Sequence, residues 1–301
     1  MATQPTLANW LSVLALGLIW GGTFMVVSIA LQGYGPLTVA SARTTLGAVA
    51  LLSLMRAMNR PMPVFDARMI KYLVVIGALN TALPFALLSW GQQYVPSAFA
   101  GISMAAVPLF VLPLAHFFTD EKLSTRNLLG VIFGFTGAVV LIGPSVLRIG
   151  TGLEPLGQIA CVAASLSYAV SSIMTRRCPP IDPITMAAML LVVGAVILIP
   201  AMLIFEGVPQ VADTKPTIAI VFLGIVPTAL AALLRVTTIR SAGTVFMTLV
   251  SYQVPVWAMI FGAFVLSEVL PLRFFAALAL IMIGLLISQW NGLRRIFARQ
   301  A

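Results

Sequence analysis

The sequence consists of long apolar runs separated by short polar connections, and this alternation constrains the fold more than any single motif does. A helix that crosses a hydrocarbon core of about 30 Å needs about 20 apolar residues, and inside lipid it must satisfy its own backbone hydrogen bonds. The runs between charge and turn clusters predict ten such helices, at 9–31, 36–57, 69–90, 97–118, 126–144, 155–175, 183–205, 216–235, 242–267 and 272–291. We therefore expect an all-α membrane protein with ten transmembrane helices.

The composition agrees with this prediction and excludes several classes of protein. Of the 301 residues, 60% are hydrophobic and 8% are charged, whereas a soluble domain has about a quarter charged residues. The formal charge of +9 reflects 17 Lys and Arg residues scattered between the apolar runs, so we expect no nucleic-acid partner. The two cysteines, Cys161 and Cys178, have no metal-binding or redox spacing, and neither a metal nor another cofactor is predicted.

The basic residues also predict how the helices are oriented. Thirteen of the 17 Lys and Arg residues fall in the connections after spans two, four, six and eight and in the C-terminal tail. Three fall on the opposite side, and one, Arg43, lies within a span. Because Lys and Arg concentrate in cytoplasmic connections, we expect both termini in the cytoplasm.

The chain repeats itself after 147 residues, which predicts two related halves, 1–147 and 148–301. The shift superposes prolines, threonines, glycines and an acid at the same helical stations: Pro36 on Pro183, Thr38 on Thr185, Gly77 on Gly224, Thr81 on Thr228, Val107-Pro108 on Val254-Pro255, Phe117 on Phe264, Glu121 on Glu268 and Gly137 on Gly284. Each half has five predicted spans. Because five is odd, the second half enters the membrane from the opposite side, and such an inverted repeat supports alternating access around a midplane site.

Several short motifs resemble the drug/metabolite transporter superfamily. They are the run Leu-Ile-Trp-Gly-Gly-Thr-Phe at 18–24, the spacing from Pro36 to Arg43, the run Val-Pro-Leu-Phe at 107–110 followed by Glu121, and their echo at Pro255 and Glu268. The resemblance covers nearly the whole chain, as two EamA-like five-helix repeats. The second repeat departs from the family pattern: Leu190 stands where the first repeat has Arg43, and Ser167-Tyr168 stands where the first repeat has Trp20.

Within that superfamily the chain looks most like the bacterial inner-membrane exporters of aromatic and other neutral amino acids. The resemblance implies a secondary transporter, not an enzyme, that moves such small molecules across the inner membrane by alternating access, in the direction of export. Export of drugs or other metabolites with broad specificity is the alternative. The resemblance also implies a central cavity lined by spans one, three, four, six, eight and nine. The expected partners are a small-molecule substrate and the lipid bilayer.

Prolines at matching stations of the two halves favour a transport site in the helices that carry them. Pro84 and Pro227 lie in spans three and eight, and Pro108 and Pro255 lie in spans four and nine. A proline removes a backbone donor and frees the carbonyl four residues earlier, which here gives the carbonyls of Asn80, Leu223, Met104 and Ser251. Such carbonyls could accept hydrogen bonds from a substrate ammonium. The alternative is that these prolines kink their helices without binding anything.

Polar and aromatic side chains lie near these prolines and complete the predicted substrate site. The polar residues are Asn80, Thr81, Thr228, Ser251, Tyr252 and Gln253. The aromatic residues are Trp20, Tyr168 and Trp257, which lie deeper than the interfacial belt where Trp and Tyr are usual. Amides and hydroxyls could hold the charged end of a zwitterion while rings stack on the rest. The alternative is structural, since hydroxyls often bond their own helix and rings often pack.

Arg43 lies deep inside span two, about 10 Å below the outer surface. A charge there is costly and marks function, unless the side chain snorkels to the headgroups. We expect Arg43 and the four prolines to have structural or gating roles, and Glu121 and Glu268 to anchor helix termini. No Asp or Glu lies within a predicted span, so proton or sodium coupling through a midplane carboxylate is not expected.

Pairs of glycines four residues apart predict close contacts between helices. They are Gly17 with Gly21 in span one and Gly130 with Gly134 in span five. Small residues let membrane helices approach closely. We expect both pairs to pack within a monomer rather than in a dimer.

Overall fold

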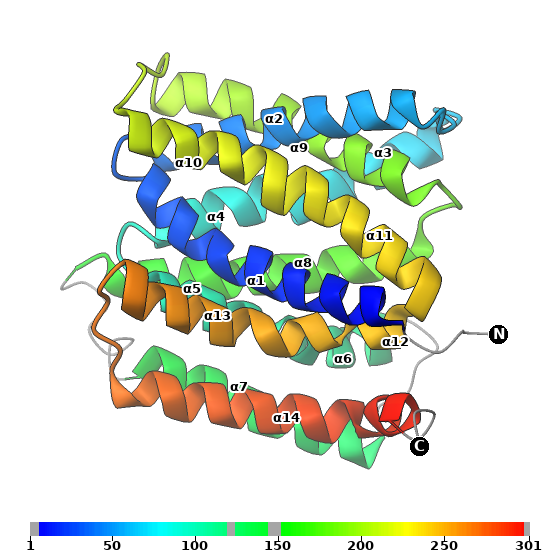
Figure 1. The fold of residues 1–301 in the computed structure, drawn as a ribbon, viewed down its shortest axis with the longest axis vertical. Helices are drawn as coiled ribbons and strands as arrows, with labels where there is room; N and C mark the ends of the chain where they lie inside the picture. The colour runs from blue at the N-terminus through cyan, green and yellow to red at the C-terminus, as the bar shows by residue number, and fades with distance from the viewer. Residues whose placement is uncertain (1–5, 119–123, 144–151, 298–301) are drawn as a thin grey trace.

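The computed structural model describes residues 6–118, 124–143 and 152–297, and all regular structure within these ranges is helical. The helices of the first half are α1 (Leu7–Ala30), α2 (Pro36–Ala57), α3 (Ala67–Gly77), η1 (Ala78–Ala82), α4 (Leu83–Gly91), α5 (Ser97–Met104), α6 (Val107–Phe118) and α7 (Thr125–Ile142). Those of the second half are α8 (Glu154–Arg177), α9 (Pro183–Phe205), α10 (Thr214–Gly224), η3 (Ile225–Leu230), α11 (Ala231–Ala242), α12 (Thr244–Met247), α13 (Leu249–Val265) and α14 (Leu272–Phe297). The all-α prediction is confirmed (Figure 1).

Helices occupy all ten predicted spans. In the described ranges, nine helical stretches are long and apolar enough to cross a membrane, and some join consecutive helices, as in Ala67–Gly91 and Thr214–Ala242. The tenth span is α13, which has 17 residues and follows the four-residue helix α12. Large apolar side chains such as Val49, Val139 and Val196 are exposed on the helix surfaces, as contact with lipid requires.

Span eight is the element whose end differs most from the prediction. It continues to Ala242 rather than ending at 235. The polar residues beyond Leu234 suggest a connection, but their hydroxyls find acceptors on the helix itself. Thr238 donates to the carbonyl of Leu234 at 2.8 Å, and Ser241 donates to that of Thr237 at 3.0 Å. Because hydroxyls can bond the preceding turn in this way, the polar stretch remains helical.

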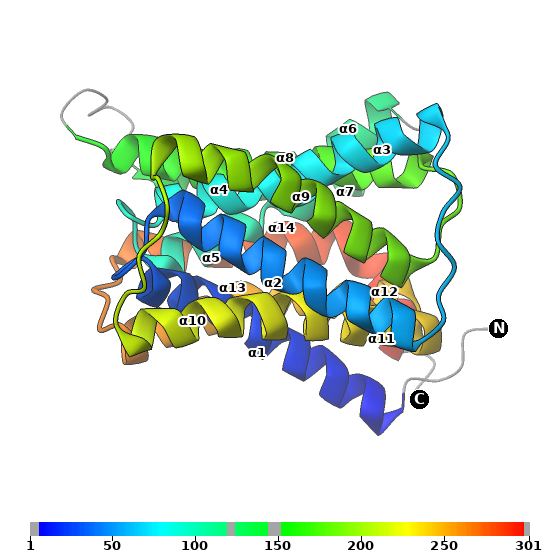
Figure 2. The ribbon, with the colours of Figure 1, turned by 90° about the horizontal axis from the view of Figure 1, so that it is seen from above.

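The helices lie side by side in one bundle (Figures 1 and 2). The helices α7 and α14 form a pair along one edge, while α1 packs against α13, α2 against α9, and α4 against α8. The first helix begins and the last helix ends at the same end of the bundle. This placement agrees with an even number of spans.

Glycines set the closest of these helix contacts, as their spacing predicts. A Cβ on Gly130 would lie 2.6 Å from the carbonyl oxygen of Gly284, so α7 and α14 meet through their backbones. A Cβ on Gly17 would lie 2.7 Å from the Cβ of Gln253, so the backbone of α1 packs directly on a side chain of α13. Helices of the same chain therefore occupy the faces that carry Gly17 and Gly130, and small residues make this approach possible.

Contacts between helices recur at the 147-residue shift. A Cβ on Gly224 would lie 2.5 Å from the Cβ of Leu46, and a Cβ on Gly77 would lie 2.7 Å from the Cβ of Val193. Leu46 and Val193 are themselves related by the shift, so α10 packs on α2 as α3 packs on α9. The inverted orientation of the halves stays a prediction, which this recurrence favours.

Two carboxylates tie one half to the other at helix ends. Glu206, just after α9, accepts a hydrogen bond of 2.8 Å from the backbone N–H of Thr38 near the start of α2. Glu268, after α13, accepts one of 2.6 Å from the backbone N–H of Ser97, the first residue of α5. Carboxylates are favourable at helix N-termini. The prediction for Glu268 is confirmed, and Glu121 lies outside the described residues.

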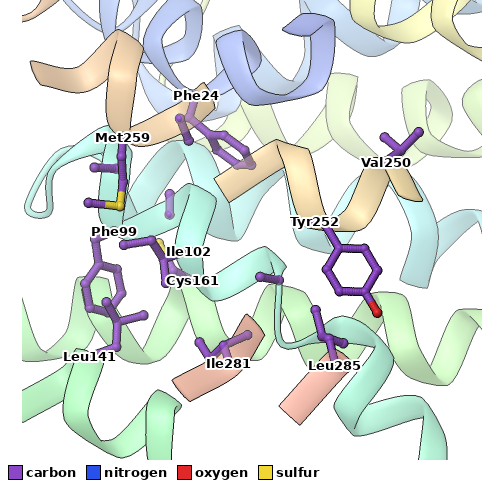
Figure 3. Close-up of a cluster of buried hydrophobic side chains, with 14 of the residues drawn as sticks. Phe24, Phe99, Ile102, Leu141, Cys161, Val250, Tyr252, Met259, Ile281 and Leu285 are labelled. Carbon is purple, nitrogen blue, oxygen red and sulfur yellow. The ribbon is translucent and has the colours of Figure 1, made fainter. Parts of the chain in front are cut away.

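The largest hydrophobic cluster contains residues from both halves (Figure 3). Its buried members include Phe24 of α1, Phe99 and Ile102 of α5, Cys161 of α8, Tyr252 and Met259 of α13, and Ile281 and Leu285 of α14. A second cluster is built mainly from α2, α3, α4 and α9. Tyr168 of α8 packs against both clusters. It therefore lies where the two parts of the core meet.

Candidate functional site

Spans three and eight each contain a π-helical segment near the middle, η1 and η3. The amides of Leu83 and Ala231, which follow these segments, each donate to the carbonyl five residues earlier. The two segments begin 147 residues apart. Because π-helical segments are rare and occur frequently at functional sites, their matched positions favour this region as the candidate site.

Proline and threonine together explain the irregular backbone. Pro227 has no N–H for the carbonyl of Leu223, which instead accepts the hydroxyl of Thr228 at 2.8 Å. In η1 the hydroxyl of Thr81 lies 2.6 Å from the carbonyl oxygen of Gly77 and 3.1 Å from that of Leu190. The Leu223 carbonyl, predicted to be free, is thus occupied by a side chain of its own helix. Thr81 and Thr228 support the two segments.

Spans four and nine are interrupted at positions that do not match. Span four breaks at 105–106, between α5 and α6 and just before Pro108. In span nine, Pro255 lies inside α13, and the interruption falls at Thr248 instead. Spans three and eight, which carry Pro84 and Pro227, are thus irregular at matching positions, and spans four and nine are not.

Two side chains reach the π-helical segments from spans one and six. Trp20 Nε1 donates to the carbonyl oxygen of Pro227 at 3.2 Å, and Ser167 Oγ donates to that of Leu79 at 2.7 Å. Trp20 and Ser167 are related by the 147-residue shift. Each half therefore supplies a donor to the segment of the other half. Ser167 is absent from the predicted site, although its relation to Trp20 was visible in the sequence.

Asn80 connects span three to span six, on which Tyr168 also lies. Ser171 Oγ donates to Asn80 Oδ1 at 3.2 Å, which joins η1 to α8. Asn80 and Tyr168 both keep part of their surface accessible. The two residues are thus held in the interior and could still contact a ligand.

Arg43 points into the bundle, not toward the headgroups. Its Nε donates to Thr228 Oγ1 at 3.2 Å, and its Cζ lies 3.9 Å from the centroid of the Phe85 ring. Tyr168 packs against the hydrophobic cluster that contains Phe85. A cation over an aromatic face is stabilised by the ring quadrupole. Arg43 thus gathers side chains from spans three and eight around span two, and Phe85 is a member that the sequence did not indicate.

Gln253 and Trp257 of span nine lie at the contact with α1. Gln253 packs against Gly17, and its Nε2 lies 3.5 Å from the carbonyl oxygen of Val13. The Trp257 ring stacks with that of Phe261, with ring centroids 5.9 Å apart. Gln253 and the Cβ of Trp257, which packs against Gly21, join α13 to α1, whereas the ring contact with Phe261 lies within α13. Both side chains remain partly accessible.

Tyr252 and Ser251 have different surroundings from these two residues. Tyr252 belongs to the large hydrophobic cluster that also contains Leu285 (Figure 3). Its hydroxyl is buried and has no hydrogen-bond partner among the described residues. Ser251 is partly accessible. The predicted residues of span nine therefore face more than one neighbour, whereas Trp20, Tyr168 and Thr228 converge on the region around η3.

A surface pocket lies away from these residues, at the end of the bundle where α2 and α8 end. It is lined by the connections around Pro61 and Pro179 and by Asp182. Asp182 forms ion pairs with Arg60 at 3.7 Å and Arg240 at 3.4 Å. None of the predicted substrate-binding residues lines this pocket.

The described residues contain no group of three His, Cys, Asp or Glu side chains that could hold a metal ion.

Beside the surface pocket, Cys178 follows the last residue of α8. Partial burial raises the pKa of its thiol above the ordinary value, because a less hydrated site disfavours the thiolate.

Comparison with known proteins gives a consistent result over almost the whole chain. Residues 8–143 and 155–290 each match the EamA-like transporter family. The second match begins and ends 147 residues after the first. A crystal structure of a protein 20% identical in sequence has a TM-score of 0.67, covering 96% of this chain and 99% of that one, which shows a shared fold.

Similar proteins come from several bacteria. The uncharacterized transporter YoaV of Bacillus subtilis is 24% identical over 288 residues, covering 95% of this chain and 98% of that protein. The uncharacterized inner membrane transporter YedA of Escherichia coli K12 is 26% identical over 282 residues, covering 92% and 89%. The probable terminal-alkyne amino-acid exporter of Streptantibioticus cattleyicolor is 24% identical over 265 residues, covering 88% and 87%.

Proposed function

The chain belongs to the EamA-like transporter family, and on that premise we propose that it exports amino acids with aromatic or apolar side chains from the bacterial cytoplasm. It is a multi-pass membrane protein of a family that transports small molecules. Alternating access between the two halves is the proposed mechanism, because spans from both halves surround the candidate site. The proposed membrane is the inner membrane, with both termini in the cytoplasm.

One observation carries the proposal: polar atoms and aromatic faces from both halves converge in the membrane interior around η3. Trp20 and Arg43 come from the first half, and Tyr168 and Thr228 come from the second. Polar groups are expensive inside a membrane and mark transport pathways. A zwitterion with an apolar side chain suits this mixture, since charged and hydroxyl groups can hold one end while rings contact the other.

The named relatives agree with this proposal at different levels. YedA is described as an inner membrane transporter, which supports the location. The relative from Streptantibioticus is described as an amino-acid exporter, which supports the substrate class. The proposed lining resembles that of a neutral amino-acid site in one further respect: no Asp or Glu lies within a predicted span to favour a cationic solute.

The test is counterflow in proteoliposomes that contain the purified full chain. Vesicles loaded with unlabelled phenylalanine, leucine, threonine, glutamate or lysine are diluted into the labelled amino acid. We expect accumulation of phenylalanine and leucine, weaker accumulation of threonine, and none of lysine. Accumulation of structurally unrelated drugs with no accumulation of amino acids would instead identify a broad-specificity exporter.

A further inference from the structure

Arg43 carries a charge in the membrane interior that no described carboxylate neutralises. The ion pairs among the described residues join Arg60 and Arg240 to Asp182, and Arg273 to Glu154. These pairs lie at helix ends, and none includes Arg43. A buried cation without a counter-charge is costly, by several kcal/mol of desolvation. The fold therefore maintains this charge against a considerable penalty.

Most of the hydrogen-bonding capacity of Arg43 is unused within the described chain. A guanidinium has five N–H donors arranged as a planar fork. The structure gives Nε a partner, Thr228 Oγ1, and gives Nη1 and Nη2 no hydrogen bond to a described residue. The side chain is also partly accessible. The outer edge of the guanidinium is therefore free to receive an acceptor from outside the chain.

Helix packing does not require the charge, because the equivalent contact in the other half forms without it. The position that matches Arg43 under the 147-residue shift is Leu190. There, the backbone carbonyl of Leu190 lies 3.1 Å from the hydroxyl of Thr81. Around Arg43, the matching hydroxyl of Thr228 accepts from the guanidinium. Both helix pairs pack through equivalent glycines, Gly77 and Gly224, so leucine suffices for the packing and arginine must serve another purpose.

We propose that Arg43 binds the carboxylate of the transported solute, an inference that rests on the proposed function and narrows its substrates to carboxylates. Arginine is the side chain best suited to a carboxylate, because its fork donates two parallel hydrogen bonds. Phe85 fixes one face of the guanidinium, and Thr228 fixes its Nε edge. Trp20 and Tyr168 then lie where the apolar side chain of the solute can contact them. This role is more direct than the structural or gating role expected from the sequence.

The experiment compares Arg43→Gln and Arg43→Lys with the unaltered protein in the same counterflow assay. Four probes share one ring: phenylalanine, 3-phenylpropionate, phenylalaninamide and phenethylamine. The unaltered protein should transport the two carboxylates and discriminate against the two amines. Arg43→Gln should raise the KM for phenylalanine about 10- to 100-fold, the loss expected when a charge-assisted hydrogen bond is removed. Arg43→Lys should give an intermediate value, because it keeps the charge and loses the fork.

The control is Arg56→Gln, on the same helix at an exposed position, which should leave every KM unchanged. The ratio of carboxylate to amine transport within one variant does not depend on how much of it folds. Transport of phenylalanine with an unchanged ratio in Arg43→Gln would overturn the Arg43 assignment and leave the proposed function standing. Arg43-dependent transport of 3-phenylpropionate without transport of phenylalanine would support the assignment and overturn the amino-acid proposal. Absence of transport for all four probes would overturn both.

Discussion

Trp20 Nε1 and the carbonyl oxygen of Pro227 are joined by a hydrogen bond of 3.2 Å, which holds the first span of one half against the irregular backbone of the other. We predict that Trp20→Ala lowers transport of phenylalanine and leucine more than that of threonine, because the ring faces the larger solutes. Tyr168→Ala should behave alike.

Trp20→Phe distinguishes the contribution of the aromatic ring from that of the hydrogen bond, because phenylalanine keeps a ring and lacks the Nε1 donor. It should retain most of the size preference and lose about 1 kcal/mol of stability, the scale of one hydrogen bond between membrane helices, as measured by thermal unfolding in detergent. Ser167→Ala removes the equivalent hydrogen bond to the Leu79 carbonyl in the other half, and its loss of stability is compared with that of Trp20→Phe. Equal losses for every solute in Trp20→Ala would assign the ring a packing role.

A second prediction concerns Gly47. A Cβ there would lie 2.5 Å from Cγ2 of Thr228, so Gly47→Ala forces α2 away from η3 and should cost about 1–3 kcal/mol, as overpacking does. The readout is the midpoint of thermal unfolding. Gly152→Ala is the control, since a Cβ there meets nothing within 4 Å. Equal midpoints for the two variants would show that span eight yields easily at this contact.

A third prediction uses Cys178 as a native probe of topology and pH. An impermeant maleimide should label it from the cytoplasmic side, while Cys161 is buried and stays unlabelled. Because partial burial raises the pKa of the Cys178 thiol, less thiolate is present at neutral pH. The labelling rate should therefore reach half of its maximum at a pH above about 8.5, which is the ordinary pKa of a cysteine thiol.

The controls for this labelling are Cys178→Ser, which should abolish it, and Gln32→Cys, which lies at the opposite end and is exposed. Gln32→Cys should react from outside the cell. Labelling of Cys178 from outside and of Gln32→Cys from inside would reverse the proposed orientation.

A fourth prediction concerns energy coupling. With no Asp or Glu in a predicted span, transport of a neutral solute should persist when ionophores collapse the proton and sodium gradients. Net efflux of labelled solute from loaded vesicles, with and without ionophore, measures this. Strict dependence on a proton gradient that disappears in His116→Ala, at the histidine in the last turn of α6, would instead indicate a proton path through that residue.

The sequence predicted the helical architecture well because its signals are strong and local. Apolar runs of sufficient length must become helices in lipid, and the glycine pairs at Gly17 and Gly130 could be recognised as contact points. The 147-residue shift indicated Thr81 and Thr228, and the depth of Trp20 within its span indicated that ring. What the sequence could not supply was the identity of their partners, since Pro227, Ser167 and Phe85 become neighbours of the site through helix packing.

In span nine, too, the sequence alone does not predict which neighbour each side chain faces. Successive residues on a helix are about 100° apart, so Ser251, Tyr252 and Gln253 cannot all face one neighbour. Nothing in the sequence distinguishes among them, and the structure places Tyr252 in the hydrophobic cluster and Gln253 against Gly17. Likewise, the position of Pro255 does not coincide with the interruption of span nine, which falls at Thr248.

The paired π-helical segments have a mechanical consequence. In each, the regular ladder of hydrogen bonds changes register at the middle of a span, and bending a helix requires least energy where that ladder is already disturbed. Spans three and eight thus have matched flexing points, while Gly77 and Gly224, just before them, hold their neighbours tightly. In the proposed alternating access, the parts of spans three and eight beyond those points can therefore tilt when the bundle opens, and the helices packed against them need not unfold or slide.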